Sequence, residues 1–322
     1  MANTSNYPGG FSSGVTIQNV PVSIPHPGKV FWVNNSSVLA PGGIGGSNSN
    51  DGTFQRPFST LDYAIGRCVA DRGDVIYVMP GYLQDMAAAD AVDADVAGIT
   101  IIGLGRGTKV PEFNYSNAAG EFVIGAANVH IENLRFVPSV TGITVGIDIE
   151  AAAHYYEVVN CRFTDGDTAG TDEFTNGINV NGADFGLFVN NFMDSGEAAA
   201  AVGISLIGAC DGTIFKNNTI IGDYSTANIN GITTLSNDVG FEFNVLINGV
   251  TSALNTTPVI DMLTGTSGWV AGNRMATDIA TSLDLMVDLD AGVNLSNYFT
   301  DDVAMTKTAV DRSAAMTVSA DA

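Results

Sequence analysis

The chain has 322 residues, of which 45% are hydrophobic, 14% are charged and 37 are glycine, a composition suited to a large, turn-rich core. Its 34 acidic residues outnumber 12 basic ones and give a formal net charge of −22, which argues against a nucleic-acid partner, because nucleic-acid binding needs a basic surface. There is no run of 18 apolar residues and no basic and apolar leader after Met1, so neither membrane insertion nor a Sec-type signal peptide is predicted.

Residues 1–30 are rich in Gly, Pro, Ser and Asn, and this composition predicts an extended arm. Apolar residues alternate with other residues in part of the arm, as in a strand that could add to the sheet of a partner. The candidate docking residues are Val15, Ile17, Val20, Val22 and Ile24. We therefore expect the arm to bind a neighbouring subunit or a larger assembly.

Residues 31–72 form the next segment, with a strand over 30–33, a polar loop over 45–53, and a helix whose N-cap is Ser59 or Thr60. The spacing of apolar residues predicts one buried helical face. That face consists of Leu61, Ile65, Cys68 and Val69.

Residues 73–299 repeat with a period of about 27 residues, and self-similarity at this length indicates a solenoid. A motif of the form apolar-x-Asn-x-x-apolar recurs, and its closing residues predict one internal column. The column consists of Phe136, Phe163, Met193, Ile220 and Ile247, with drifted copies that end at Met275 and Phe299. A second marker, Gly-Ile-x-x, begins at Gly146, Gly177, Gly203 and Gly231.

The repeats alternate apolar and polar residues over three to five positions, which is the period of a strand and not of a helix. Short strands that each pair in parallel with their copy one repeat away form a parallel β-helix, here of about seven or eight coils. Residues 300–322 lose the repeat, and we expect them to form a C-terminal cap or docking tail.

Residues 45–81 carry a family resemblance. Its motifs are Asn50-Asp51-Gly52-Thr53, Arg56-Pro57-Phe58-Ser59-Thr60-Leu61, Ala64-Ile65, Gly73-Asp74-Val75-Ile76-Tyr77-Val78 and Pro80-Gly81. This pattern resembles the start of the β-helices of the pectin-lyase-like superfamily. The resemblance implies an all-β, right-handed, single-stranded parallel β-helix with an N-terminal capping helix. It implies no single activity, because that superfamily includes polysaccharide lyases and hydrolases, bacteriophage tailspikes and non-catalytic virion proteins.

Two arginines, Arg135 and Arg162, occupy the same place in adjacent repeats, and Arg274 lies near that place in a later repeat. Lyases of this superfamily use basic residues, so these arginines could stabilise a developing carbanion. The alternative is that they face outward and make an acidic surface more soluble, and we favour this alternative.

The most acidic turn lies in the longest spacing of the column. Asp165, Asp167 and Asp172 could bind a hard cation such as Ca²⁺, but Ala169 stands where another oxygen ligand is expected. We favour a solvated loop there, and no cofactor is predicted.

The remaining ionisable residues are spread along the chain. Asp90, Asp93 and Asp95 predict a solvated turn, and His154-Tyr155-Tyr156 could belong either to a sugar-binding surface or to aromatic packing. Because glycosidase and lyase chemistry both need converging ionisable groups, we assign no catalytic residue and expect no activity.

The short, nearly uniform body and the arm favour a non-catalytic bacteriophage structural protein, a capsid decoration or short surface spike located in the virion. The expected partners are two further copies in a homotrimer, a capsid or other virion protein, and a host surface glycan. The alternative is a tailspike-type polysaccharide lyase or hydrolase.

Overall fold

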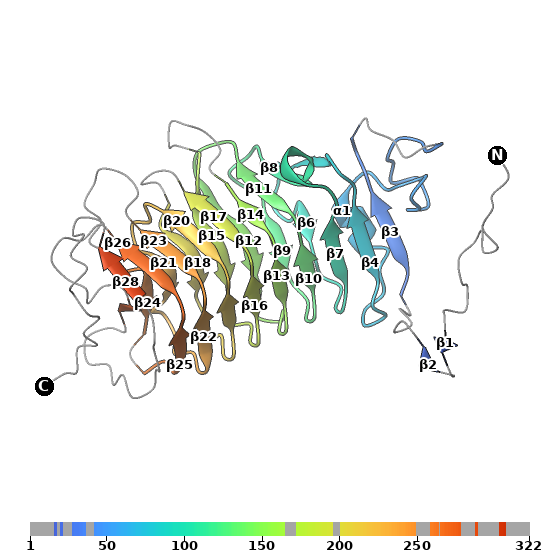
Figure 1. Cartoon of the computed structure of the whole chain (residues 1–322). Helices are drawn as coiled ribbons and strands as arrows, with labels where there is room; N and C mark the ends of the chain where they lie inside the picture. Colours follow the sequence, from blue (N-terminus) through green and yellow to red (C-terminus); the bar gives the residue numbers. More distant parts are fainter. Residues whose placement is uncertain are drawn as a thin grey trace, which may run out of the picture.

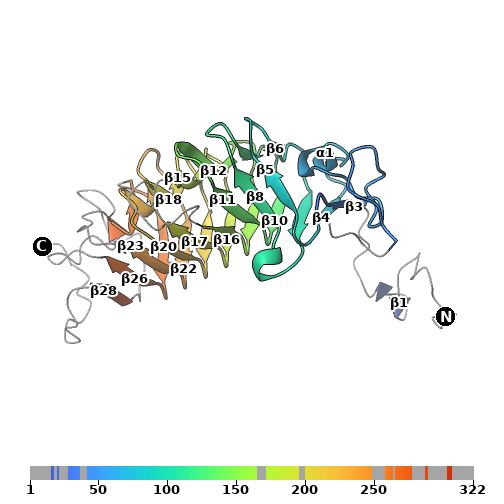
Figure 2. The ribbon, with the colours of Figure 1, turned by 90° about the horizontal axis from the view of Figure 1, so that it is seen from above.

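The computed structural model describes residues 16–17, 20–21, 28–36, 42–164, 172–195, 200–248, 258–263, 265–277, 287–288 and 303–306. Over these residues the chain forms an elongated parallel β-solenoid of about seven turns, with three parallel sheets of nine, nine and eight strands. The strands stack in a row from β3 to β28 (Figure 1), and the view from above shows the same row (Figure 2). The predicted all-β solenoid is confirmed.

In each coil the chain passes through the three sheets in the same order, and we number the sheets in that order. In spatial order the first sheet contains β3 (Val30–Val33), β4 (Val75–Val78), β7 (Thr100–Gly103), β10 (His130–Glu132), β13 (Glu157–Val159), β16 (Leu187–Val189), β19 (Ile214–Lys216), β22 (Val239–Glu242) and β25 (Gly268–Ala271). Its central residues point inward, and Phe188, Phe215 and Phe241 stack with ring centroids 5.0 and 5.1 Å apart. This spacing matches the distance between paired strands.

The second sheet follows after a two-residue turn in most coils. It contains β5 (Leu83–Asp85), β8 (Glu112–Tyr115), β11 (Arg135–Pro138), β14 (Arg162–Phe163), β17 (Phe192–Ser195), β20 (Thr219–Gly222), β23 (Val245–Asn248), β26 (Arg274–Thr277) and β28 (Val303–Thr306). The third sheet contains β6 (Val92–Asp93), β9 (Phe122–Ile124), β12 (Ile143–Ile149), β15 (Phe174–Val180), β18 (Val202–Leu206), β21 (Ala227–Gly231), β24 (Ile260–Met262) and β27 (Val287–Asp288).

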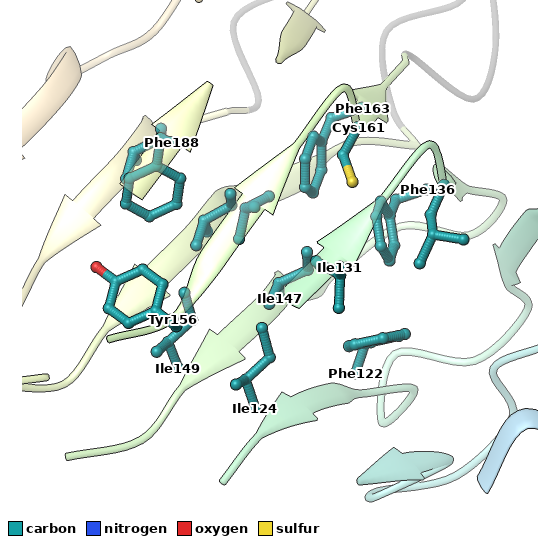
Figure 3. Close-up of a cluster of buried hydrophobic side chains, with 14 of the residues drawn as sticks. Phe122, Ile124, Ile131, Phe136, Ile147, Ile149, Tyr156, Cys161, Phe163 and Phe188 are labelled. Atoms are coloured by element: carbon teal, nitrogen blue, oxygen red, sulfur yellow. The ribbon is translucent and has the colours of Figure 1, made fainter. Parts of the chain in front are cut away.

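The predicted internal column lies in the second sheet. The register pairs Phe136 with Phe163, Phe163 with Met193, and Met193 with Ile220, and the rings of Phe136 and Phe163 stack at 4.8 Å (Figure 3). The fifth assignment is wrong by one residue, because Ile220 pairs with Leu246. Leu246 is fully buried, whereas Ile247 is only partly buried.

The column then continues beyond the fifth strand. Leu246 pairs with Met275 and Met275 with Ala304 of β28. Phe299, which the sequence places in this series, lies outside the described residues.

The second marker defines the third sheet. Ile147 pairs with Ile178, and Ile178 with Ile204, as the repeat predicts. In the next coil Ile229 takes the place expected for Ile232, so the marker that was assigned to Gly231 is three residues out of phase. Ile229 is fully buried and Ile232 is 42% exposed.

The turn between the first and second sheets contains two adjacent columns of asparagines. Asn190 and Asn217 have φ of 56° and 55°, a left-handed conformation that asparagine tolerates better than most residues. The next residues, Asn191 and Asn218, are buried, and Asn191 donates from N and Nδ2 to Oδ1 of Asn218, both at 3.0 Å. Asn244 continues this buried ladder and accepts from Asn218 at 2.9 and 3.0 Å.

The N-terminal helix is shorter than predicted. α1 (Leu61–Ile65) has only five residues, and Val69, which was assigned to its buried face, is 50% exposed. The backbone N of Val69 donates to Oδ2 of the buried Asp74 at 2.8 Å, and this contact turns the chain away from the helix. A 3₁₀ helix, η1 (Gly107–Lys109), is the other short helical turn among the described residues.

The segment before the coils closes the free edge of β3. Trp32 N donates to Gly52 O at 2.8 Å, and Phe58 N donates to Trp32 O at 2.9 Å. Covering an edge strand in this way prevents uncontrolled pairing with other chains.

The pairing also shifts the predicted boundaries. β3 belongs to the segment expected to precede the coils, yet it pairs in parallel with β4, and β28 pairs with β26 beyond residue 299. In the arm, β1 (Thr16–Ile17) and β2 (Val20–Pro21) pair antiparallel. No helix in the described part of the chain is long and apolar enough to cross a membrane.

Candidate functional site

The outer face of the third sheet carries a column that is mainly polar and runs along the solenoid. Residues that follow its members in the chain, such as Ile149 and Val180, are fully buried, so strand alternation places the column outside. From β6 to β24 the column contains Asp93, Val123, Asp148, Asn179, Ser205, Asn230 and Asp261.

Amides and carboxylates of this face are hydrogen-bonded between coils. Asn181 Nδ2 donates to Oδ1 of Asp148 at 2.8 Å, and Asn230 Nδ2 donates to Oδ2 of Asp261 at 3.3 Å. Asp93, Asp148, Asn179 and Asp261 are half-buried, whereas Ser205 and Asn230 are only 8% and 7% exposed. The half-buried polar groups can contact the hydroxyl groups of a ligand.

Acidic residues converge at the β6 end of this face, and we call Asp93, Asp95, Glu121, Asp148 and Glu150 the acidic cluster. They come from β6, β9 and β12 or from positions within two residues of those strands. A Cβ atom on Gly125 would lie 3.2 Å from Oε2 of Glu150 and 3.3 Å from Oδ1 of Asp93. The two carboxylates therefore approach the same point, and glycine leaves that point free.

Asp93 has the most altered chemistry in the acidic cluster. Burial, and then the negative charges of Asp95, Asp90, Glu150 and Asp62, raise its pKa to about 6. Its Oδ1 atom is buried and accepts no hydrogen bond from any described residue. Asp93 is therefore a carboxyl group that can keep its proton at mildly acidic pH.

Two further members of the cluster are shifted in the same direction. Burial, followed by the charge of Asp148, raises the pKa of Glu121. Burial also raises the pKa of Asp148, although the hydrogen bond from Asn181 opposes this effect. Neighbouring carboxylates thus add to the effect of burial on Asp93 and Glu121, whereas burial alone raises the pKa of Asp148.

Glu150 and Asp95 are the members of the cluster that are exposed to solvent, and of these two Glu150 shares the point over Gly125 with Asp93. A protonated carboxyl group beside an accessible carboxylate is the arrangement that glycoside hydrolysis uses, with one group as the acid and the other as the base or nucleophile. Asp93 and Glu150 can take these two roles. The charged groups that shift the pKa of Asp93 are all acidic. Their negative charge disfavours the binding of an anionic sugar at this site.

Within the described ranges, no group of three or more His, Cys, Asp or Glu residues is arranged to hold a metal. Asp165 and Asp167, two of the predicted Ca²⁺ ligands, lie outside the described residues, whereas Asp172 lies within them. That cation site stays a prediction.

The predicted arginines share a column in the second sheet, and the acids Asp165 and Asp167 of the turn after Arg162 lie outside the described residues. Arg135 pairs with Arg162 in the register. Arg135 Nη1 contacts Oε2 of Glu112 at 2.9 Å, and the Arg162 guanidinium lies 5.1 Å from the ring centroid of Phe192. Both contacts belong to the outer face of the second sheet and stabilise it.

The residues of His154-Tyr155-Tyr156 separate in space. Tyr156 is fully buried, whereas Tyr155 is 55% exposed and stacks on Phe185 with ring centroids 4.9 Å apart. His154 Nδ1 accepts from the backbone N of Asp184 at 3.0 Å. Packing inside the solenoid thus explains Tyr156 but not Tyr155.

The docking residues of the arm are only partly described. Ile17 pairs with Val20 in the β1–β2 hairpin, and Val15, Val22 and Ile24 lie outside the described residues. Docking by the arm therefore stays a prediction.

The sequence does not predict the acidic cluster. Its pattern places Asp93 and Asp95 in a solvated turn and gives no role to Glu121 or Glu150. One signal was present, since Asp148 occupies the third position of the Gly146 marker and Asn179 the same position of the next marker. Equal phase in a parallel solenoid places such residues in one outer column.

Comparisons with known proteins identify the fold. No family model and no curated protein matches the sequence. A pectate lyase, Pel9A, is similar in structure with a TM-score of 0.54 and 13% identity, over 89% of this chain and 82% of that one. A rhamnogalacturonan lyase is similar with a TM-score of 0.49 and 15% identity, over 78% of this chain and 69% of that one. The predicted resemblance to pectin-lyase-like β-helices is confirmed for the fold.

Proposed function

We propose that this chain is a polysaccharide-active β-solenoid that hydrolyses a neutral or weakly charged glycan on the outer face of its third sheet. The observation that carries the proposal is the approach of Asp93 and Glu150 to one point over Gly125, together with the raised pKa of Asp93. The pectate lyase that shares the fold acts on a polysaccharide, and this supports a glycan as the substrate class.

The proposed reaction uses each carboxyl group once. Asp93 donates its proton to the glycosidic oxygen as the bond to the anomeric carbon breaks. Glu150, which is exposed, accepts a proton from the water that attacks that carbon. The products are two shorter glycans, one of which has a new reducing end.

Hydrolysis fits this site better than elimination. A lyase abstracts a proton from the carbon beside the carboxylate of a uronic acid. In this site that carboxylate would lie near Asp95, Asp90 and Glu150, the same acids whose charges raise the pKa of Asp93. Like charges at such distances disfavour binding. The virion structural role that the sequence favours stays a prediction, and the acidic cluster favours the enzymatic alternative.

The test is release of reducing ends from a panel of neutral and uronic polysaccharides between pH 4 and 8. We expect activity on a neutral glycan that falls as pH rises above about 6, because Asp93 then loses its proton. Asp93→Asn and Glu150→Gln should each lower kcat by about 10²–10⁴-fold.

Asp238→Asn is the matched control, because Asp238 is exposed and lies on a corner outside the acidic cluster. It should leave activity unchanged. Unsaturated uronate products would show that the chain cleaves by elimination and not by hydrolysis. No release of reducing ends from any glycan in the panel would contradict an enzymatic role.

A further inference from the structure

The outer face of the first sheet is largely apolar. Inward residues such as Ile76 and Ile101 are fully buried, so their chain neighbours on either side face outward. Outward apolar side chains include Trp32, Tyr77, Ile102, Val159, Val189 and Trp269. A solvated sheet face is usually polar in alternation with a buried one, and this face departs from that rule.

Exposed aromatic residues extend this face at the corner that precedes the first sheet. Successive coils place Asn128, Tyr155, Phe185, Gly212 and Asp238 at this corner, all with φ between 56° and 67°. Asn, Asp and Gly suit this left-handed conformation, whereas it is costly for bulky residues. Tyr155 and Phe185 are nevertheless 55% and 51% exposed and lie parallel at 4.9 Å.

The corner on the other side of the first sheet shows the same exception. Asn190 and Asn217 occupy this corner in two successive coils, and Phe243 occupies it in the next coil, with φ of 54° and 58% of its surface exposed. A Cβ atom on Gly272 in the next coil would meet the Phe243 ring at 2.5 Å. Packing over glycine explains where this ring lies, but not why a mostly exposed aromatic residue replaces asparagine.

The charged side chains on the strands of this face contact one another. His130 Nδ1 contacts Oε2 of Glu157 at 2.7 Å, and Lys216 Nζ contacts Oε2 of Glu242 at 2.8 Å. Glu132, the remaining acid on the described strands of the first sheet, lies 3.5 Å from Nε2 of His130. In a chain with a net charge of −22, this is therefore a face on which acids are partly neutralised.

We propose that this face, with its aromatic corners, is a self-association surface that packs against the same face of a second copy of this chain. Repulsion between two strongly acidic molecules is least where acids are few, and the described strands of the first sheet carry three acids, each in contact with His130 or Lys216. A flat surface that meets its own copy across a two-fold axis gives a closed dimer.

The size of the face agrees with a dimer. Nine strands at about 4.8 Å extend for about 40 Å, and about five residues per coil, corners included, add a width of about 15 Å. The resulting area of about 600 Å² per copy reaches the lower limit of specific interfaces. A glycan fits this face less well, since its polar groups are already engaged with one another.

Sedimentation velocity of the full chain tests the proposal. We expect the wild type to sediment with twice the 33.4 kDa mass of the chain. The double variant Tyr155→Asn with Phe185→Asn should weaken the dimer roughly 30-fold or more, as expected for hot-spot aromatics, and asparagine suits the backbone at both positions.

The matched control is Ile207→Asn with Ile232→Asn, which removes two apolar side chains that are 38% and 42% exposed directly after β18 and β21 of the third sheet. This control should leave the dimer intact. Val189→Glu, at an outward position on β16, gives a second test that does not depend on the corners and should also dissociate the dimer. A monomeric or trimeric wild type, or a dimer that survives the corner and Val189 substitutions, overturns the proposal.

Discussion

At the scale of single residues, the buried asparagine ladder combines stability with register. Asn218 accepts two hydrogen bonds from Asn191 and donates to Phe188 O at 2.9 Å and to Oδ1 of Asn244 at 3.0 Å. A buried amide is favourable only if its polar atoms are satisfied. The ladder satisfies them only when the coils are stacked in the correct register.

Asn218→Ala should therefore destabilise the fold by about 2–4 kcal/mol, because it leaves buried donors and acceptors without partners. Urea unfolding followed by circular dichroism measures this loss. Asn217→Gly is the matched control, since Asn217 is exposed with φ of 55° and should change stability by less than about 1 kcal/mol. Equal effects at the two positions would contradict the ladder.

Asp93 gives a residue-scale prediction for pH. Its pKa is raised to about 6 in the folded chain and returns to about 3.9 on unfolding, so the folded state binds the proton more tightly. Its contribution is therefore present below about pH 4 and is lost as pH rises through about 6. Asp93→Asn should stabilise the chain at pH 7.5 by about 1–2 kcal/mol after allowance for solvent screening.

Urea titrations at pH 4.5 and pH 7.5 measure this effect, with Asp238→Asn as the control. The gain from Asp93→Asn should be smaller at the lower pH. An equal gain at both values would mean that Asp93 is not titrating between them.

At the scale of elements, the sequence predicts the strands and their stacking well but the phase of single coils less well. Neighbouring asparagines, as in Asn190-Asn191, carry opposite roles, one at a left-handed corner and one in the core. In the fifth copy Phe243 takes the corner, so an alignment on Asn244 moved the predicted column from Leu246 to Ile247. Residue type alone does not distinguish these two positions.

The candidate site was less predictable than the fold for a related reason. Its members lie in three coils, and their convergence depends on the register between β6, β9 and β12. Glu121 and Glu150 belong to no recurring motif. Pairing identifies them only after the strand boundaries are known.

The outer column of the third sheet should bind the substrate as one element. Asn179 lies in the coil after Asp148 and pairs with it in the register. Asn179→Ala should raise KM by roughly 10-fold and leave kcat within about two-fold, as expected for a group that binds substrate and transition state equally. Steady-state kinetics on the glycan found active in the panel measures this split. A loss in kcat alone would place Asn179 in the chemistry instead.

At the scale of the whole molecule, the chain combines a continuous core with an unusually acidic composition. Solenoids are stabilised by contacts between adjacent coils, and here stacked rings and amides continue from coil to coil. Against these contacts stands a net charge of −22. Self-repulsion of that kind weakens a compact state.

Salt should therefore stabilise this protein. The screening length falls from about 30 Å at 10 mM to less than 8 Å at 0.5 M ionic strength, which weakens repulsion between coils more than it weakens close ion pairs. We expect NaCl at 0.5 M to raise the free energy of unfolding by on the order of 1 kcal/mol, the energy of one close carboxylate pair in water. Urea is the denaturant for this measurement, because guanidinium chloride is itself a salt.

Asp93→Asn supplies the internal control for the salt effect. It removes one charge from the acidic cluster, so the variant should gain less from NaCl than the wild type gains. A fall in stability with salt would mean instead that ion pairs such as Arg135–Glu112 and Lys216–Glu242 contribute more than the repulsion. The same titration thus decides whether the acidic surface or its few cations dominate the electrostatics of the solenoid.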